Sequence, residues 1–200
     1  HGREALVLAI FHDGDAAEGR ELIAPLRRFG DPWGEHIGLQ PYTQWQQAFD
    51  PLLAPGARNY WKSLTFTELP DGLWDAVLAA AGRLPTPECE IFVGMIAGAA
   101  NRVPADAMAY FHRDAKFVMN VHGRWQEASD DARGVAWAQE FFTAAQPYAA
   151  AGGYVNFMTA EEDDRVPAAY GSNYQRLRAI KKAYDPENLF HHNQNIAPGG

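Results

Sequence analysis

Tyrosine, asparagine and histidine residues recur at every second position in short apolar segments of this sequence. The pairs are Tyr110 with His112, Asn120 with His122, and Tyr154 with Asn156. Histidine and tyrosine exchange protons, and asparagine both donates and accepts hydrogen bonds, so these residue types suit a site for a polar small molecule. Side chains two residues apart on a β-strand share a face, so this spacing would gather each pair on one side of a sheet.

Strands would carry these pairs, and we expect them over residues 107–112, 116–125 and 154–158, the first two joined by a tight turn. In the segment 116–125, Phe117, Met119 and Val121 point one way, and Val118, Asn120 and His122 point the other. We expect the apolar face to pack under helices and the polar face to meet a ligand or another domain. A half-solvated face of an ordinary antiparallel sheet is the alternative, which periodicity alone leaves open.

The remaining periodicities predict a single α+β domain over residues 1–200. Further strands are expected over 5–11, 61–69 and 90–97, and helices over 16–29, 71–84, 129–148 and 169–184. Residues 30–60 are rich in proline, glycine and aromatic residues and predict a long packed loop with a short helix near 43–49. Short turns between consecutive strands favour an antiparallel sheet with helices packed on one face.

Composition narrows the class of protein. The 200 residues contain 17 Lys+Arg and 25 Asp+Glu, a net charge of −8, and no basic cluster, which argues against nucleic acid and anionic membranes as partners. The single cysteine, Cys89, excludes a disulfide framework and a thiolate metal cage. No apolar run approaches the ~18 residues of a membrane span, and the N-terminus has no signal-peptide pattern. We therefore expect a cytoplasmic rather than a secreted protein.

Two other groups of polar residues could be considered for metal binding, and neither suits it. His191 and His192 are adjacent, so their side chains diverge, and the acidic run 161–164 lacks the spaced ligands of a calcium loop. We expect a solvated loop there and no bound metal. A metal-dependent enzyme that uses His112, His122, His191 or His192 remains the least favoured alternative.

The C-terminal part of the sequence carries the most specific pattern. Its motifs are YVNF at 154–157, YGSNYQRL at 170–177, IK at 180–181, YDPENLF at 184–190 and NQNI at 193–196, followed by Pro198. Upstream blocks in the same order are PLR at 25–27, PY at 41–42, FD at 49–50, NYWKS at 59–63 and FHR at 111–113. Together they resemble berberine-bridge-enzyme-like, FAD-linked oxidoreductases, densely over residues 154–198.

The resemblance implies a two-domain flavoprotein of which this chain is the substrate-binding domain. The N-terminal FAD-binding domain is then absent and is the expected partner, together with a small-molecule substrate. The open face of the sheet would cover the flavin in the complete protein. We expect the chain alone to hold no FAD and to be inactive, and its uncovered sheet face to promote self-association. A stand-alone binding module without redox activity is the alternative.

The resemblance also implies roles for individual residues. Tyr154 and Asn120 would be catalytic, Val118, His122 and Tyr110 would contact the substrate, and Asn156, Asn193 and Gln194 would contact the flavin. The implied reaction removes a proton from a hydroxyl- or amine-bearing small molecule and transfers a hydride to FAD. An amide does not titrate near neutrality, so Asn120 cannot be the base, which leaves Tyr154, with His122 as helper or alternative.

Overall fold

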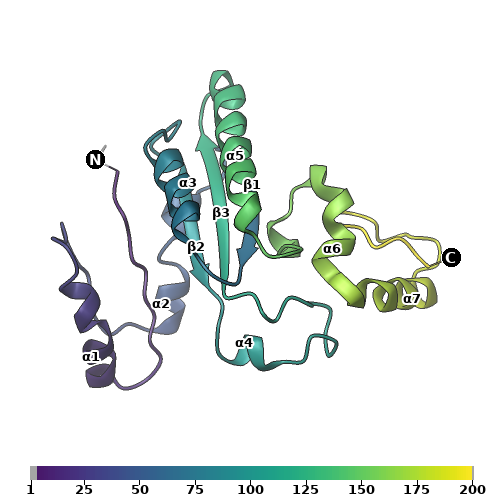
Figure 1. Cartoon of the computed structure of the whole chain (residues 1–200), viewed down its shortest axis with the longest axis horizontal. Coiled ribbons are helices and arrows are strands. Elements are labelled where there is room, and N and C mark those ends of the chain that lie inside the picture. The colour runs from purple at the N-terminus through teal and green to yellow at the C-terminus, as the bar shows by residue number, and fades with distance from the viewer. Residues whose placement is uncertain (1–3, 200) are drawn as a thin grey trace. The chain divides into compact units, whose positions relative to one another are not determined.

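The computed structural model describes residues 4–199, which divide after Pro55 into two compact units (Figure 1). The first unit contains helix α1 (Ala16–Arg27), the short helix α2 (Tyr42–Gln46) and a 3-10 turn at Asp50–Leu53. Helix α1 begins after Asp15, whose carboxylate accepts hydrogen bonds from the backbone N–H groups of Ala17 and Glu18 at 2.8 and 3.1 Å. The helices expected near 16–29 and 43–49 are therefore confirmed.

The strand expected over residues 5–11 is wrong. This segment is irregular and exposed in the structure, and no ladder hydrogen bonds join it to another segment among residues 4–199. A strand is stable only when a neighbour satisfies its backbone groups, so an apolar run alone does not make one. Its last residue, Phe11, instead packs against Tyr42 and Trp45, with ring centroids 5.3 and 5.6 Å apart.

The second unit is built on a three-stranded antiparallel sheet. Strands β1 (Arg58–Phe66), β2 (Glu90–Met95) and β3 (Phe117–Trp125) have the order β1-β3-β2, so β3 is central. Ser63 of β1 and Phe92 of β2 both lie opposite Asn120 of β3. The antiparallel sheet and these three expected strands are confirmed.

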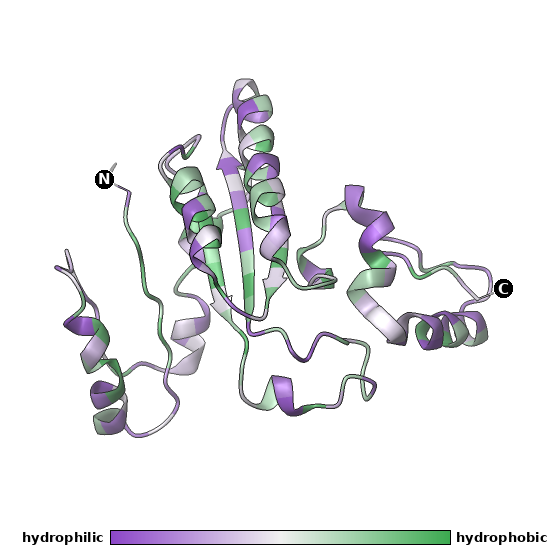
Figure 2. Cartoon of the chain, in the orientation of Figure 1, coloured by the Kyte–Doolittle hydropathy of each residue, from purple (hydrophilic) through white to green (hydrophobic). Residues whose placement is uncertain are grey.

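Helices α3 (Asp71–Ala81) and α5 (Asp131–Ala145) contribute with one face of the sheet to the main core. The core includes the fully buried Phe66, Leu73, Met119 and Val121. Trp137 of α5 is buried there too, and its indole N–H donates to the carbonyl of Ala80 at 3.0 Å. Strand β3 alternates between hydrophilic and hydrophobic bands along its middle (Figure 2), as a strand with one buried face must. The fold is α+β, as the sequence predicts.

The strands expected over 107–112 and 154–158 are wrong. The first segment follows a short helix, α4 (Ala99–Arg102), and is irregular. The second is a 3-10 turn, Val155–Phe157, because Phe157 N–H bonds to the carbonyl of Tyr154 at 2.9 Å instead of to a neighbouring strand. Strand alternation therefore does not apply to Tyr110, Tyr154 and Asn156.

The C-terminal part is a series of short helices. After 3-10 turns at Ala128–Asp130, Gln146–Tyr148 and Ala160–Arg165, the chain forms α6 (Val166–Tyr170), a 3-10 turn at Gly171–Asn173 and α7 (Tyr174–Tyr184). The single helix expected over 169–184 is thus broken at Gly171, where φ is +52° and a Cβ would lie 2.4 Å from the Phe111 ring. No helix among residues 4–199 is long and apolar enough to cross a membrane.

Candidate functional site

The face of the sheet opposite α3 and α5, here called the open face, carries polar and aromatic side chains, and one valine, from the three strands. They are Asn59, Trp61, Ser63 and Thr65 of β1, Glu90 and Phe92 of β2, and Val118, Asn120, His122 and Arg124 of β3. The alternation expected for Val118, Asn120 and His122 is therefore confirmed. Phe92 is 48% exposed, so this part of the open face is accessible.

His122 is held in one orientation by neighbours on both sides. Its Nε2 lies 3.1 Å from Asn59 Oδ1, and its Nδ1 lies 3.6 Å from a carboxylate oxygen of Glu90. The Asn59 amide cannot flip without loss, because its Nδ2 donates to the Ala57 carbonyl at 2.8 Å and its Oδ1 accepts from Arg124 at 3.3 Å. His122 must therefore donate through Nε2, which leaves Nδ1 as the atom that accepts a proton.

Asn120 has a side-chain oxygen that is buried and has no hydrogen-bond partner among residues 4–199. The same holds for the hydroxyl of Thr65, which lies on the same face. Between them, the Ser63 hydroxyl donates to the carbonyl of Phe157 at 3.3 Å. Buried polar atoms normally have partners, so these two oxygens are exceptions within the sheet.

Tyr110, Tyr154 and Asn156 form a second group, although none of them lies on a strand. The Tyr110 and Tyr154 rings meet edge to face at 6.0 Å, and Asn156 Nδ2 donates to the Tyr154 hydroxyl oxygen at 2.8 Å. Burial raises the pKa of Tyr110, against the opposing effect of the Arg113 guanidinium 4.9 Å from its ring centroid. Among the described residues, no hydrogen bond or ring contact joins Tyr154 to Asn120.

A cavity of about 270 Å³ lies beside β1, here called the Trp61 cavity. Its lining residues are Asn59, Tyr60, Trp61, Met158, Thr159, Ala160, Asn193 and Gln194. Gln194 is fixed there because its side-chain amide donates to the carbonyl of Met158 at 2.8 Å. The structure thus brings Asn193 and Gln194 next to Asn59 and Trp61 of the open face. Alternation in the block NYWKS would have identified Asn59 and Trp61 as open-face residues, had the strand been taken to begin at residue 58.

The segment that follows Thr159 and Ala160 of the cavity lining is attached to β1 by charged side chains. Lys62 Nζ lies 2.6 Å from a Glu161 oxygen and 3.5 Å from a Glu162 oxygen, and the Tyr60 hydroxyl also donates to Glu161. Burial lowers the pKa of Lys62, but the hydrogen bond to Glu161 and the charge of Glu162 outweigh it, so the net shift is upward. The Lys62 hydrogen bond, followed by that of Tyr60, lowers the pKa of Glu161.

The solvated loop expected over residues 161–164 is therefore wrong in one respect. Glu162 is buried, and its carboxylate accepts hydrogen bonds from the Thr159 backbone and hydroxyl, both at 2.9 Å, and from Arg165. A buried carboxylate needs such partners, and the sequence did not show which cations would reach it. Among residues 4–199, no three His, Cys, Asp or Glu side chains are arranged to hold a metal ion.

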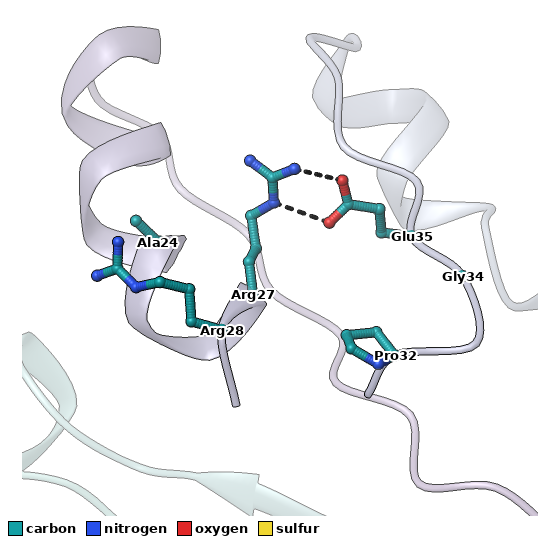
Figure 3. Close-up of a pocket in the computed structure, with 6 residues that line it drawn as sticks. All are labelled: Ala24, Arg27, Arg28, Pro32, Gly34 and Glu35. Carbon is teal, nitrogen blue, oxygen red and sulfur yellow. Dashed lines mark hydrogen bonds and ion pairs between the residues drawn. The ribbon is translucent and has the colours of Figure 1, made fainter. Parts of the chain in front are cut away.

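The first unit has a separate cavity of about 430 Å³, lined by Ala24, Arg27, Arg28, Pro32, Gly34 and Glu35 (Figure 3). The Arg27 guanidinium makes two hydrogen bonds to Glu35, at 2.8 and 2.5 Å. Glu35 thereby neutralises the charge of Arg27, and none of the residues that the sequence assigns to a site lies in this cavity.

Comparison with known proteins identifies the C-terminal segment. Residues 153–197 match the family described as berberine and berberine like. This segment is a berberine-bridge-enzyme-like domain segment. Over nearly its whole length the chain is also related to FAD-linked oxidoreductases. It is 27% identical over 187 residues to the uncharacterized FAD-linked oxidoreductase YgaK of Bacillus subtilis, covering 92% of this chain and 41% of the relative. An FAD-linked oxidoreductase of Dictyostelium discoideum is 26% identical over 98% of this chain and 43% of its own length.

Solved structures share the fold around the berberine-like segment. A variant of berberine bridge enzyme superposes over 94% of this chain and 45% of its own, with a TM-score of 0.74 and 19% identity. The glycopeptide hexose oxidase that was crystallised with teicoplanin covers 72% of this chain and 33% of its own, with a TM-score of 0.65 and 23% identity. At these identities the likeness shows the fold alone. The chain spans about two fifths of the length of the two curated relatives.

Proposed function

We propose that this chain is the substrate-binding portion of an FAD-dependent oxidoreductase that transfers a hydride from a hydroxyl- or amine-bearing small molecule to flavin. The observation that carries the proposal is the relationship to FAD-linked oxidoreductases over 92% and 98% of the chain. The polar open face supports it, because a site for a small polar substrate needs a few converging hydrogen-bonding groups on a rigid support. The alternative of a binding module without redox activity has no comparable support.

The side chains present fit the flavin ring but not the rest of FAD. The oxidised ring system is flat and uncharged and has N–H and C=O groups on one edge, which an amide complements. Asn156 uses its Nδ2 on Tyr154 and keeps Oδ1 for such an edge. The sequence has no glycine-rich loop for the phosphates. We therefore propose that an FAD-binding domain supplies the cofactor site and that this chain alone retains no FAD.

FAD, when bound, supplies the acceptor for the hydride. The residues of this chain position the substrate and take its proton. We assign proton acceptance to Tyr154, which would act as the phenolate and become the phenol, and Asn156 Nδ2 donates a hydrogen bond to its oxygen. Asn120 has a free carbonyl oxygen to accept a hydrogen bond from the substrate. Val118, His122 and Tyr110 would contact the rest of the substrate, with His122 Nδ1 as the alternative proton acceptor.

Spectra of two proteins test this proposal. The 200-residue chain alone should be colourless, whereas the same chain joined to an FAD-binding domain from a relative should show flavin absorbance that bleaches when a substrate alcohol is added without oxygen. A colourless joined protein would refute the function proposed here.

Tyr154→Phe should keep the flavin absorbance and lose about 10²–10⁴-fold in the rate of bleaching, the usual contribution of a general base. Tyr184→Phe is the matched control, because Tyr184 is 87% exposed and lies far in the sequence from Tyr154 and from the residues of β3. If Tyr154→Phe bleaches at the parent rate, Tyr154 is not the proton acceptor, and His122→Asn becomes the decisive variant.

A further inference from the structure

The loop that leads into β3 carries Tyr110 but has no regular structure of its own. Residues 103–115, here called the pre-β3 loop, form neither a helix nor a strand. Backbone polar groups outside helices and sheets need other partners, so the course of such a loop depends on side chains that reach it from elsewhere. In this protein several of those side chains come from residues 168–176, at the junction of α6 and α7.

Asn173 makes the largest share of these contacts. It ends the 3-10 turn before α7 and is only 6% exposed. Its Nδ2 lies 2.6 Å from the carbonyl oxygen of Ala105, 3.0 Å from that of Met108 and 3.5 Å from that of Ala109. The amide has two N–H groups, so Ala105 and Met108 each accept one, and Ala109 adds a longer, shared contact. The opposite orientation would place Oδ1 against three carbonyl oxygens, so the Asn173 amide has one acceptable orientation.

The same junction holds the pre-β3 loop on the other side of Tyr110. His112 is buried, and its Nε2 lies 2.8 Å from the carbonyl oxygen of Ala168. The exposed Arg176 donates through Nη1 to the carbonyl of Asp106 at 3.1 Å. Tyr110 therefore lies between two fixed points of the loop, one at residues 105–108 and one at His112.

Tyr110 in turn contacts the ring of Tyr154. The two rings meet edge to face, with centroids 6.0 Å apart and planes at 88°. The other contacts of Tyr154 come from its own turn, because Phe157 meets the ring at 5.2 Å and Asn156 donates to its oxygen. Tyr110 thus supplies a contact to Tyr154 from a distant part of the sequence, and the orientation of the Tyr154 ring depends on where the pre-β3 loop places Tyr110.

We propose that Asn173 is a positioning residue for the proton transfer assigned to Tyr154. By holding the carbonyls of Ala105 and Met108, Asn173 places Tyr110 against Tyr154, and the Tyr154 oxygen is kept within reach of the proton that it accepts. Asn173 acts through Tyr110, since no hydrogen bond or ring contact joins Asn173 to Tyr154 among residues 4–199. The proposal rests on the proposed function, which makes Tyr154 the proton acceptor.

NMR of the tyrosine rings in the 200-residue chain tests this coupling without any flavin. An aromatic ring shifts the signals of a neighbouring ring, so Tyr110→Leu identifies the part of the Tyr154 shift that Tyr110 causes. Asn173→Ala should move the Tyr154 signals toward their positions in Tyr110→Leu. Asn173→Asp keeps the shape but removes the donor, so it should move them at least as far. Tyr154 signals that are unchanged in both Asn173 variants would overturn the proposal.

Two more variants separate positioning from a general loss of stability. Trp137→Phe removes the buried hydrogen bond to the Ala80 carbonyl in the main core. It should lower the urea midpoint and leave the Tyr154 signals where they are in the parent. Asn173→Ser keeps a hydroxyl donor and should give an intermediate shift. If the Ala and Asp variants do not fold, unchanged Tyr154 signals in Asn173→Ser would overturn the proposal.

The chain joined to an FAD-binding domain tests the consequence for the reaction. Asn173→Ala should keep the flavin absorbance and slow bleaching at saturating alcohol by about 10- to 100-fold, because a misplacement of about 1 Å costs up to about 10²-fold. The alcohol concentration that gives half the maximal rate should change little, since binding is not the step affected. In a Tyr110→Leu background, Asn173→Ala should cause no further loss. Equal losses with and without Tyr110 would overturn the proposal.

These results are separable from the proposed function. A joined protein that bleaches at the parent rate with Asn173→Ala would refute only the role of Asn173. A joined protein that never bleaches, in a chain whose Tyr154 signals respond to Asn173, would refute the redox function while the hold of Asn173 on Tyr154 stands.

Discussion

Gly134 lies in helix α5 where a helix would normally favour alanine. Replacing a helix-interior glycine by alanine contributes about 1 kcal/mol of stability from backbone entropy alone. Gly134 is buried, however, and an alanine Cβ would lie 2.3, 2.5 and 2.8 Å from three ring atoms of Trp125 on β3. Real Cβ atoms do not approach so closely, so either the ring or the helix must move.

The Trp125 ring has little freedom to move. It is only 3% exposed, and its indole N–H donates to Asp131 at 2.7 Å, at the first turn of the same helix. Overpacking of a filled core costs about 1–3 kcal/mol. Three close atoms place Gly134→Ala at the upper end, so after the ~1 kcal/mol helix gain we expect a net loss of about 2 kcal/mol.

Urea unfolding followed by circular dichroism measures this loss. With a slope of about 2 kcal/mol/M, the midpoint should fall by about 1 M. Thr143→Ala is the matched control on an exposed position of α5, and it should leave the midpoint unchanged or raise it slightly. Adding Trp125→Leu to Gly134→Ala should make the two changes less than additive, because the clash is gone. A Gly134→Ala protein that is more stable than the parent would show that α5 and β3 are not packed this closely.

Three other predictions follow from contacts around the site. The folded pKa of Glu161 is lowered, so its contribution to stability is present above the unfolded value of about 4.3 and is lost as pH falls through the folded pKa. Lys62→Met should therefore make the urea midpoint depend less on pH across that acidic range. A pH profile that is the same in Lys62→Met and the parent would contradict the pairing of Lys62 with Glu161. Nitrogen-15 NMR should show neutral His122 as the Nε2–H tautomer in the parent and as a mixture of tautomers in Asn59→Ala. A mixture already in the parent would argue against the hydrogen bond from His122 Nε2 to Asn59. Cys89 is buried, so a thiol reagent should label it only after urea unfolding, and rapid labelling of the native chain would be inconsistent with the fold.

Periodicity predicted the central part of the sheet well, because Phe117, Met119 and Val121 bury one face of β3 and a strand with one buried face must alternate. It failed at 5–11 and 107–112, where apolar residues recur but no neighbouring strand pairs with them. Pairing depends on segments distant in the sequence, and a local pattern does not contain that information.

The candidate site was predicted in part. Asn120 and His122 share the open face as expected, whereas Tyr154 and Asn156 come together through a turn and not through a strand. Trp61 was missed, because its role depends on residues 158–160 and 193–194 packing beside it. A cavity made by segments about 100 and 130 residues apart leaves no spacing signal in the sequence.

The residues that line the Trp61 cavity come from two kinds of structure, a strand and two turns. Asn59 and Trp61 belong to β1, whose course is fixed by pairing with β3, whereas residues 158–160 and 193–194 belong to turns outside the main core. Turns accept substitution with little loss of stability, and strands do not. Met158 is buried and Thr159 donates to the buried Glu162, so the residues that can be exchanged while the frame around Asn120 and His122 stays as it is are those at 160, 193 and 194. Exchanging residues 160, 193 and 194 together would be a direct way to redirect binding in the laboratory.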